Sequence, residues 1–446
     1  MKMASDKNTK APAALKNIFR SLQYRNYRLF FGGQSLSLIG TWIQRIAIPW
    51  LVYHLTGSAF LLGLVGFAGQ IPTFLLSPFA GVVTDRWSRY YILIATQILA
   101  MIQALILAFL FFTRVIEVWH IILLSVLLGC VNAFDMPARQ ALVVEMVEKK
   151  EDLGNAIALN SSMVNGARLL GPSIAGILIA YAGEGICFLL NGISYIFVIL
   201  SLILMKVKYQ KKEIQNPDIL KELKEGFSYT FGFPPIKSII LLLALVSLMG
   251  MPYTILMPVF VKEVLHGGPH TFGFLMGASG IGALISAIYL ASRRTVVGLG
   301  KFIPLSAGIF GLGLVAFSLS RLFLLSFILM LVTGLGMMLQ MATSNTIIQT
   351  IVDDDKRGRV MSIYAMAFMG TVPFGSFLAG SMASVLGAPK TIMVGGIFCI
   401  LGASIFAKKL NELRKLVRPI YIRLGIIPEI ATGIQTATEL TVPPEK

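Results

Sequence analysis

Charged residues and cysteines are both scarce in this sequence. Only 13% of its 446 residues are charged, while 56% are hydrophobic and the mean hydropathy is +0.78. A soluble globular domain carries about a quarter of its residues as charges, so that class is excluded. The three cysteines, Cys130, Cys187 and Cys399, lie in apolar stretches without metal-ligand spacing. A disulfide framework is therefore excluded as well, and we expect no metal and no cofactor.

The motifs of enzymes and channels are absent too. The sequence contains no Walker motif, no zincin motif, no nucleophile elbow and no paired carboxylates. The glycine-rich segments 277–280 and 311–313 lie inside apolar runs, which indicates helix packing rather than nucleotide binding. No stretch resembles the filter of a channel. We therefore predict no catalytic residues and no enzyme, with an intramembrane enzyme as the rival class.

Long apolar stretches are abundant. About twelve of them are each about 20 residues long, which is the length that a helix needs to cross a bilayer core of about 30 Å. This pattern predicts an all-α membrane protein with twelve transmembrane helices. The predicted spans are 30–53, 60–83, 90–113, 118–138, 156–182, 185–205, 238–262, 271–291, 300–319, 322–344, 360–386 and 389–407.

The basic residues are distributed unevenly around these spans. If both termini lie in the cytoplasm, thirty-two of the 38 Lys and Arg residues fall in inside loops and tails. The positive-inside rule therefore predicts a multi-pass protein of a bacterial inner membrane with both termini cytoplasmic. The net charge of +17 follows from this topology, so we expect no nucleic-acid partner. The chain is polar and basic through Arg28, so we expect no removable signal peptide.

A polar segment divides the chain into two halves. We expect a cytoplasmic tail at 1–29, a six-helix bundle at 30–205, a linker at 206–237, a second six-helix bundle at 238–407 and a cytoplasmic tail at 408–446. The linker pattern predicts a short amphipathic helix on the membrane surface. The last tail begins with a basic amphipathic pattern, which predicts a helix on the inner leaflet.

The two halves resemble each other. Residues 171–176 in span five read GPSIAG, and residues 375–380 in span eleven read GSFLAG at the same place in their half. A charged inside loop precedes each span, at 148–152 and at 353–357. Such a six-plus-six repeat is typical of a carrier whose substrate sits near the midplane, between the halves.

The loop between spans two and three reads GVVTDRWSR at 81–89. It resembles the signature loop of the major facilitator superfamily, with Gly81, Asp85, Arg86 and Arg89 in the family's pattern and Ser88 in place of its usual glycine. The resemblance implies two pseudo-symmetric six-helix bundles. Gly81 would let a neighbouring helix approach, and Asp85 would accept hydrogen bonds from the arginines. We predict a conformational latch here, and a simple topological anchor of two basic residues is the alternative.

Span five resembles the superfamily's antiporter motif, with Gly166, Gly171-Pro172 and Gly176. Close helix packing explains Gly171, Pro172 and Gly176 nearly as well. The segments at 26–30 and 135–139 are similar to the enterobactin-exporter-like branch of the superfamily. That resemblance covers nearly the whole chain, and it implies a secondary-active exporter of siderophores, drugs or similar amphiphiles.

Two arginines lie inside predicted spans, where a charge costs about 2.5–3.5 kcal/mol on insertion scales. Arg45 is near the middle of span one, and Gln34 and Trp42 share its helical face. Arg168 is near the middle of span five, with Asn165 on the same face. Both spans border the central cavity in this superfamily. We therefore predict that the two arginines face one aqueous pocket and bind an anionic group of the substrate.

Acidic residues are missing from the middle of every predicted span. Asp135, near the inner end of span four, is therefore the candidate for carrying a coupling proton. It could instead pair with Arg139 and be structural. Pairing between Asp135 and Arg168, or bonds from the arginines to span carbonyls, would likewise give the arginines a structural role.

The second half contributes uncharged candidates for the same site. Tyr253, Gln340 and Asn345 would offer polar contacts beside a group of methionines around 337–341. The sequence thus predicts a secondary-active transporter that exports an amphiphilic, anionic, siderophore- or drug-like molecule by alternating access. A lysophospholipid flippase is the alternative carrier. The expected partners are the small-molecule substrate, the lipid bilayer and a proton or another coupling ion, and we expect a monomer.

Overall fold

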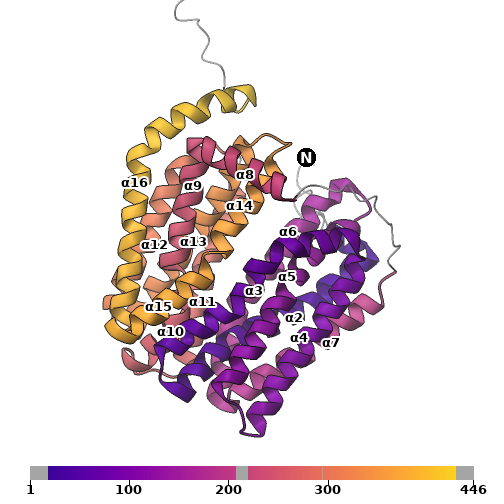
Figure 1. Cartoon of the computed structure of the whole chain (residues 1–446), viewed down its shortest axis with the longest axis vertical. Coiled ribbons are helices and arrows are strands. Elements are labelled where there is room, and N and C mark those ends of the chain that lie inside the picture. The colour runs from indigo at the N-terminus through magenta and orange to yellow at the C-terminus, as the bar shows by residue number, and fades with distance from the viewer. Residues whose placement is uncertain (1–18, 207–218, 294, 428–446) are drawn as a thin grey trace, which may run out of the picture.

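A computed structural model describes residues 19–206, 219–293 and 295–427. The described residues form helices and short connections, without a strand. They are arranged in two bundles, with the first half of the chain in one and the second half in the other (Figure 1). The all-helical, two-bundle architecture predicted from the sequence is therefore confirmed.

The N-terminal bundle is built from six long helices after one short 3-10 turn. Its elements are η1 (Arg20–Gln23), α2 (Arg25–Thr56), α3 (Ala59–Arg86), α4 (Arg89–Phe112), α5 (Val118–Glu145), α6 (Lys150–Ala182) and α7 (Glu184–Ile203). The turns between them are tight. Gly57 ends α2 with a φ of 62°, which a glycine adopts at little cost, and the Ser58 side chain then caps α3 by accepting from the Leu61 backbone N–H.

The C-terminal bundle contains two interrupted spans that the sequence predicted as continuous. Its elements are α8 (Ile219–Gly232), α9 (Pro234–Leu245), the π-helical turn η2 (Val246–Gly250), α10 (Tyr253–Glu263), α11 (Pro269–Ser292), η3 (Leu299–Lys301), α12 (Phe302–Leu319), α13 (Phe323–Ile351), α14 (Arg357–Met369), α15 (Val372–Leu386) and α16 (Ala388–Arg423). Span seven breaks between η2 and α10, and span eleven breaks between α14 and α15. The two breaks contact each other, because the Ser247 hydroxyl donates a hydrogen bond to the Phe368 carbonyl oxygen. Within a membrane, a backbone group at a helix break needs such a partner from a neighbouring helix.

Eleven of the described helical segments are long and apolar enough to cross a membrane. The helix α2 is not among them, although it is 32 residues long and packs against α6 and α7 inside its bundle. Its polar residues Gln34, Gln44 and Arg45 lower its hydropathy, and the structure buries both glutamines. With α2 included, the described helices reach the twelve spans that the sequence predicts.

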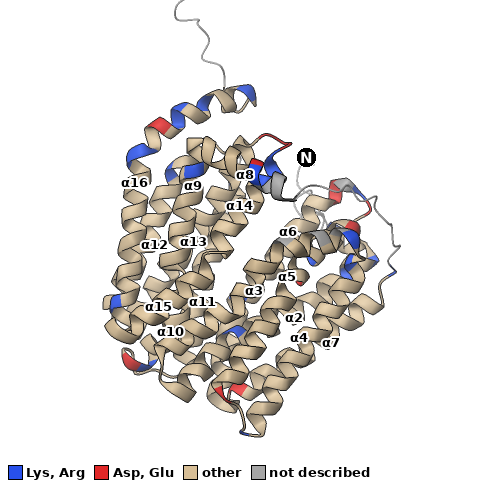
Figure 2. Ribbon diagram, in the orientation of Figure 1, with Lys and Arg blue, Asp and Glu red and all other residues tan. Residues whose placement is uncertain are grey.

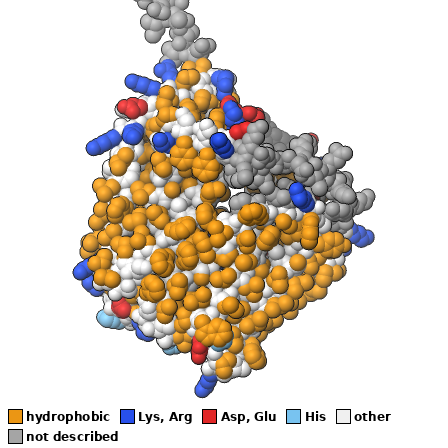
Figure 3. All heavy atoms as spheres, viewed as in Figure 1, with side chains coloured by type: hydrophobic (Ala, Val, Ile, Leu, Met, Phe, Trp, Pro, Cys, Tyr) orange, Lys and Arg blue, Asp and Glu red, His pale blue; other side chains and the backbone are white. Residues whose placement is uncertain are grey.

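The two bundles meet at one end of the molecule and diverge toward the other (Figure 1). We call the end where they meet the closed end, and the end that carries α8 and the last turns of α16 the basic end, because Lys and Arg gather there (Figure 2). Between the two ends, the visible face is covered mainly by hydrophobic side chains (Figure 3). An apolar belt of this kind is what a bilayer requires.

Glycine pairs bring the bundles together at the closed end. A Cβ atom built on Gly63 of α3 would lie 2.7 Å from the Cα atom of Gly380 in α15. A Cβ atom on Gly176 of α6 would lie 2.9 Å from the Cα atom of Gly273 in α11. Both distances are shorter than any real contact of a side chain, so the backbones touch directly only because glycine stands on both helices. The two crossings occupy matching places in the two halves of the chain.

The linker helix and the C-terminal helix both pack on the C-terminal bundle at the basic end. Glu225 of α8 pairs with Arg359 of α14 at 2.8 Å, and the Tyr229 hydroxyl of α8 donates to Asp353 at 3.3 Å. Burial and the Asp353 carboxylate raise the pKa of Tyr229, which keeps the hydroxyl protonated as a donor. Arg423 of α16 binds the same carboxylate at 3.0 Å.

The apolar side of the α16 extension is partly covered by protein. Leu413 is 7% exposed, and Leu410, Val417 and Ile420 pack against the core of the C-terminal bundle. The sequence predicts that this amphipathic helix lies on the inner leaflet, and the structure shows that part of its apolar face packs on the bundle while Leu416 is 45% exposed. The pattern indicates that one face is buried but does not identify what covers it.

Candidate functional site

Two guanidinium groups flank one indole ring between the bundles. Arg45 of α2 lies over the Trp42 ring, with its Cζ atom 5.0 Å from the ring centroid, and Arg168 of α6 lies 6.0 Å from the same centroid. Arg45 is exposed although it lies in the middle of a long helix. The two arginines are therefore brought to one aromatic platform, where cation–π attraction replaces part of the lost hydration.

Close packing of two helices positions this platform. A Cβ atom on Gly171 of α6 would lie 2.4 Å from the Trp42 Cβ atom, so any larger residue at 171 would push α6 away from α2. The backbone of α6 is thereby held against Trp42, three residues after Arg168. Arg168 also reaches the other bundle, since its Nη2 atom lies 3.8 Å from the Met337 sulfur of α13. The site thus lies where the two bundles adjoin.

Three buried amides fix the rotation of α2, and the sequence analysis missed this node. The Gln44 Nε2 group donates to Gln103 Oε1 of α4 at 3.0 Å, and Gln44 Oε1 accepts from Asn191 Nδ2 of α7 at 2.8 Å. All three side chains are at most 3% exposed. Because Gln44 precedes Arg45, this node also holds Arg45 on its face of α2. Amide side chains inside spans one, three and six were the available signal.

Replacing Gln44 by leucine should therefore loosen the N-terminal bundle. The change leaves Gln103 and Asn191 without their partners inside the membrane, and we expect a loss of about 2 kcal/mol in stability. Thermal unfolding of purified protein in detergent would measure it. Gln34→Leu is the matched control on the same helix, because the buried Gln34 Oε1 atom has no hydrogen-bond partner. Equal unfolding temperatures for the two variants would contradict the prediction.

The other predicted binding residues are mostly buried in this conformation. Gln34 is 2% exposed and Tyr253 is 3% exposed, with the Tyr253 hydroxyl 3.0 Å from the Ser279 hydroxyl. Gln340 is 1% exposed, and its Nε2 atom has no partner. The structure therefore does not place these three side chains on an open surface. Helical spacing predicted the face of the helix and could not predict what packs against it.

Two further amides of the prediction bond within their own helices. Asn165 donates to the Ser161 carbonyl oxygen of α6 at 2.9 Å, and Asn345 accepts from Gln349 of α13 at 2.5 Å. The Asn165 bond stays within α6, whereas Asn345 also forms a side-chain hydrogen bond with Tyr364 of α14. Among the second-half candidates, it is a methionine, Met337, that contacts the arginine platform.

Asp135 lies in a buried polar cluster between α4 and α5. Its carboxylate is 2% exposed and pairs with Arg139 one turn later on α5. It also accepts from the Thr96 hydroxyl at 3.0 Å and from the Gln97 amide at 2.5 Å. Of the pairings that the sequence left open, the one with Arg139 is formed. The arginines of the platform are thus not neutralised by this acid.

Comparison with known families matches residues 17–417 to a family described as transmembrane secretion effector. The chain belongs to the major facilitator superfamily. It is accordingly a multi-pass secondary transporter, as the sequence predicted.

The transporter is similar to several curated proteins over most of its length. It is 28% identical to the staphyloferrin A transporter of Staphylococcus aureus (strain NCTC 8325 / PS 47), over 85% of this chain and 95% of that protein. It is 22% identical to macrolide efflux protein A of Streptococcus pyogenes, over 88% and 99% of the two chains. Siderophore and drug transport therefore both occur among the proteins it resembles.

Solved structures share its fold. A bacterial homologue of the human lysosomal transporter Spinster, in an inward-facing and unoccupied conformation, superposes with a TM-score of 0.65 at 15% identity, covering 88% of this chain and 98% of that one. A POT family transporter in complex with 5-aminolevulinic acid gives a TM-score of 0.72 at 11% identity, covering 87% and 96%.

The signature loop of the transporter lies at the basic end, away from the contacts between the bundles. Arg89 pairs with Glu145 of α5 in its own bundle at 2.6 Å, and Arg86 is exposed. The Asp85 side chain lies outside the described residues. No described atom lies within 4 Å of a Cβ atom built on Gly81, so the predicted close helix approach at Gly81 is absent here. The bundles diverge toward this end (Figure 1), and no described helix of the opposite bundle lies against Gly81.

Two of the three glycines of the antiporter-like motif make close contacts, whereas no described atom lies within 4 Å of a Cβ atom built on Gly166. Gly171 faces Trp42 inside the N-terminal bundle, whereas Gly176 faces Gly273 of the opposite bundle. Pro172 lies between them inside α6, and its carbonyl oxygen would be 2.5 Å from a Cβ atom on Gly273. The motif therefore serves both the arginine platform and the closed end.

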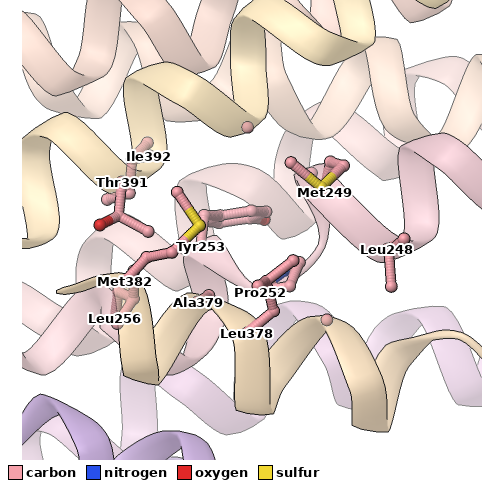
Figure 4. A pocket seen from close by; sticks show the side chains of 13 residues that line it. Leu248, Met249, Pro252, Tyr253, Leu256, Leu378, Ala379, Met382, Thr391 and Ile392 are labelled. Atoms are coloured by element: carbon pink, nitrogen blue, oxygen red, sulfur yellow. The ribbon is translucent and has the colours of Figure 1, made fainter. Parts of the chain in front are cut away.

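A separate small cavity lies within the C-terminal bundle, at the break in span seven. Met249, Tyr253, Met382 and Thr391 are among its lining residues, drawn from η2, α10, α15 and α16 (Figure 4). Its volume of about 20 Å³ is enough for one water molecule. This volume is too small for a transported solute.

Proposed function

We propose that the transporter exports an amphiphilic anion from the cytoplasm, and that Arg45 and Arg168 bind its anionic group. The observation that carries the proposal is the pair of guanidinium groups on one indole ring, midway along their helices. A guanidinium forks onto the paired oxygens of a carboxylate or phosphate and keeps its charge. The indole and Met337 offer apolar contact beside the charge. Such a surface favours a ligand that has both an anionic group and an apolar part.

The proposed direction follows from the distribution of charge. Lys and Arg gather at the basic end (Figure 2), and the positive-inside rule assigns that end to the cytoplasm together with both termini. The closed end then faces outward, and the conformation is open to the cytoplasm. A substrate would reach the platform from the cytoplasm and leave after the bundles rock about it. We propose a bacterial inner membrane as the location.

The proposed substrate class rests on the platform together with the relatives. The names of the staphyloferrin A transporter and of macrolide efflux protein A point to siderophore- and drug-like solutes. Of these two classes, we favour an anionic, siderophore-like solute, because Asp135 pairs with Arg139 and does not neutralise the two arginines of the platform. We further propose that Asp135 carries the coupling proton and that the transporter acts as a monomer.

Transport of a matched pair of probes would test the proposed function. A fluorescent amphiphilic carboxylate and its neutral amide would be added to inside-out vesicles with and without the transporter. We expect transporter-dependent uptake of the carboxylate to be at least about tenfold faster, because a charge-assisted bond is worth about 1.5–3 kcal/mol. Equal uptake of the two probes would refute the anionic substrate class.

A further inference from the structure

We infer that Tyr53 and Glu263 form the latch that holds the closed end shut. The Tyr53 hydroxyl donates to Glu263 Oε1 at 2.5 Å. Tyr53 is in the last turn of α2, in the N-terminal bundle, and Glu263 is the last residue of α10, in the C-terminal bundle. The bond therefore joins the two bodies that must separate before the closed end can open. This inference rests on the alternating-access part of the proposed function.

The surroundings of Tyr53 favour this bond over solvation. The tyrosine is 5% exposed, so its hydroxyl needs a partner within the protein. The Lys262 Nζ atom lies 5.4 Å from the centroid of the phenol ring. Two consecutive residues of α10 thus hold the ring and the hydroxyl of one side chain from the opposite bundle. A charge-assisted bond of this kind is stronger than a bond between neutral groups.

The other contacts at the closed end are less directional. Trp50, one turn before Tyr53, stacks on Phe272 of α11 with centroids 5.9 Å apart, and the glycine pairs described above touch through backbone atoms. Stacked rings and smooth backbones can slide over each other with little change in contact area. A hydrogen bond is lost once the atoms move apart by about 1 Å. The Tyr53–Glu263 bond is therefore the contact that distinguishes the closed arrangement from an open one.

The next residue, His54, anchors the end of α2 to its own bundle. His54 pairs with Glu184 of α7 at 3.2 Å, inside the N-terminal bundle. The end of α2 is thus anchored to its own bundle by His54 and to the opposite bundle by Tyr53. When the bundles rock as rigid bodies, the His54–Glu184 contact is kept and the Tyr53–Glu263 bond is the one released.

Labelling of a reporter cysteine would test the latch without any substrate. Cys130, Cys187 and Cys399 would be replaced by alanine, and Asn165→Cys, one turn from Arg168, would serve as the reporter. A membrane-impermeant maleimide would be added to intact cells and, separately, to inside-out vesicles. We expect Tyr53→Phe to raise the labelling rate from outside by about tenfold and to lower it from inside. Glu263→Gln keeps an acceptor but loses the charge, so a smaller rise is expected.

Tyr181→Phe is the matched control. It removes a tyrosine hydroxyl from the closed end of α6, where the side chain is 89% exposed, and its labelling should equal that of the unchanged reporter. Labelling of Tyr53→Phe at the rate of Tyr181→Phe would overturn the latch. If Tyr53→Phe does not fold, as judged by its elution in detergent, the labelling rate of Glu263→Gln is compared with that of Tyr181→Phe instead, and equal rates would overturn the latch. A lost preference for anionic probes would refute the proposed substrate and leave these labelling rates unaffected.

Discussion

Replacement of Arg168 by alanine is expected to reduce export of an anionic substrate by about 100-fold, and to leave the protein folded. The guanidinium is the group that would meet the anion, and a charge-assisted bond is worth about 1.5–3 kcal/mol. For the fold, the same guanidinium is of little benefit, since the Met337 thioether that it contacts across the bundles is a weak acceptor. Removing a charge from a span also lowers the cost of insertion. Vesicle transport and thermal unfolding of one preparation would measure both effects.

Two further variants separate the charge of Arg168 from its shape. Arg168→Lys keeps the charge and loses the planar fork, so we expect part of the export to return. Arg321→Ala removes an exposed arginine from the connection before α13, and export should be unchanged. Normal export by Arg168→Ala would refute the substrate role of this residue.

Replacement of Asp135 by alanine is expected to cost about 3–5 kcal/mol of stability, enough to prevent accumulation of folded protein. The change leaves the partly buried Arg139 without its counter-charge, and it leaves Thr96 and Gln97 without their acceptor. An uncompensated charge away from water is among the most damaging defects in a protein. The yield of monodisperse protein in detergent and its unfolding temperature would measure the effect. An unfolding temperature equal to that of the unchanged protein would show that the ion pair is not needed for the fold.

A double replacement separates folding from coupling at this position. Asp135→Ala combined with Arg139→Leu removes both charges, and replacing a buried pair by apolar residues is often neutral for stability. We expect the double variant to fold and to bind the substrate while losing uphill export driven by a proton gradient. Full uphill export by the folded double variant would refute the coupling role and leave Asp135 purely structural.

The helices were predictable from the sequence because apolar length is a strong signal in a membrane protein. The breaks in spans seven and eleven were not, because Pro252 and Gly370 stand inside runs that remain apolar on both sides. In a membrane such residues are tolerated within helices when neighbours satisfy the backbone, as Ser247 does here. Hydropathy therefore predicts where a span lies but not whether it is continuous.

The candidate site was only partly predictable, and the limit was packing. The two arginines, Arg45 and Arg168, stood out because charges inside spans are rare, and Trp42 stood out because it shares the helical face of Arg45. The structure brings the three side chains together. Gln34 and Gln340 share the right helical faces, yet neighbouring helices cover them. The node around Gln44 was missed because an amide inside a span carries no sign of its partners. Such partners become visible only when the spans are assembled.

We expect the glycine crossing between α3 and α15 to act as a pivot while the basic end opens or narrows. From Gly63 to the end of α3 at Arg86 the helix extends about 35 Å at 1.5 Å per residue. A tilt of about 10° around that pivot would displace the far end by about 6 Å over this arm. An adjustment of a fraction of an ångström between two glycines is thus amplified into a passage wide enough for a solute. Adding one methyl group at Gly63 or Gly380 would change the angle of this crossing before it changed anything at the arginines.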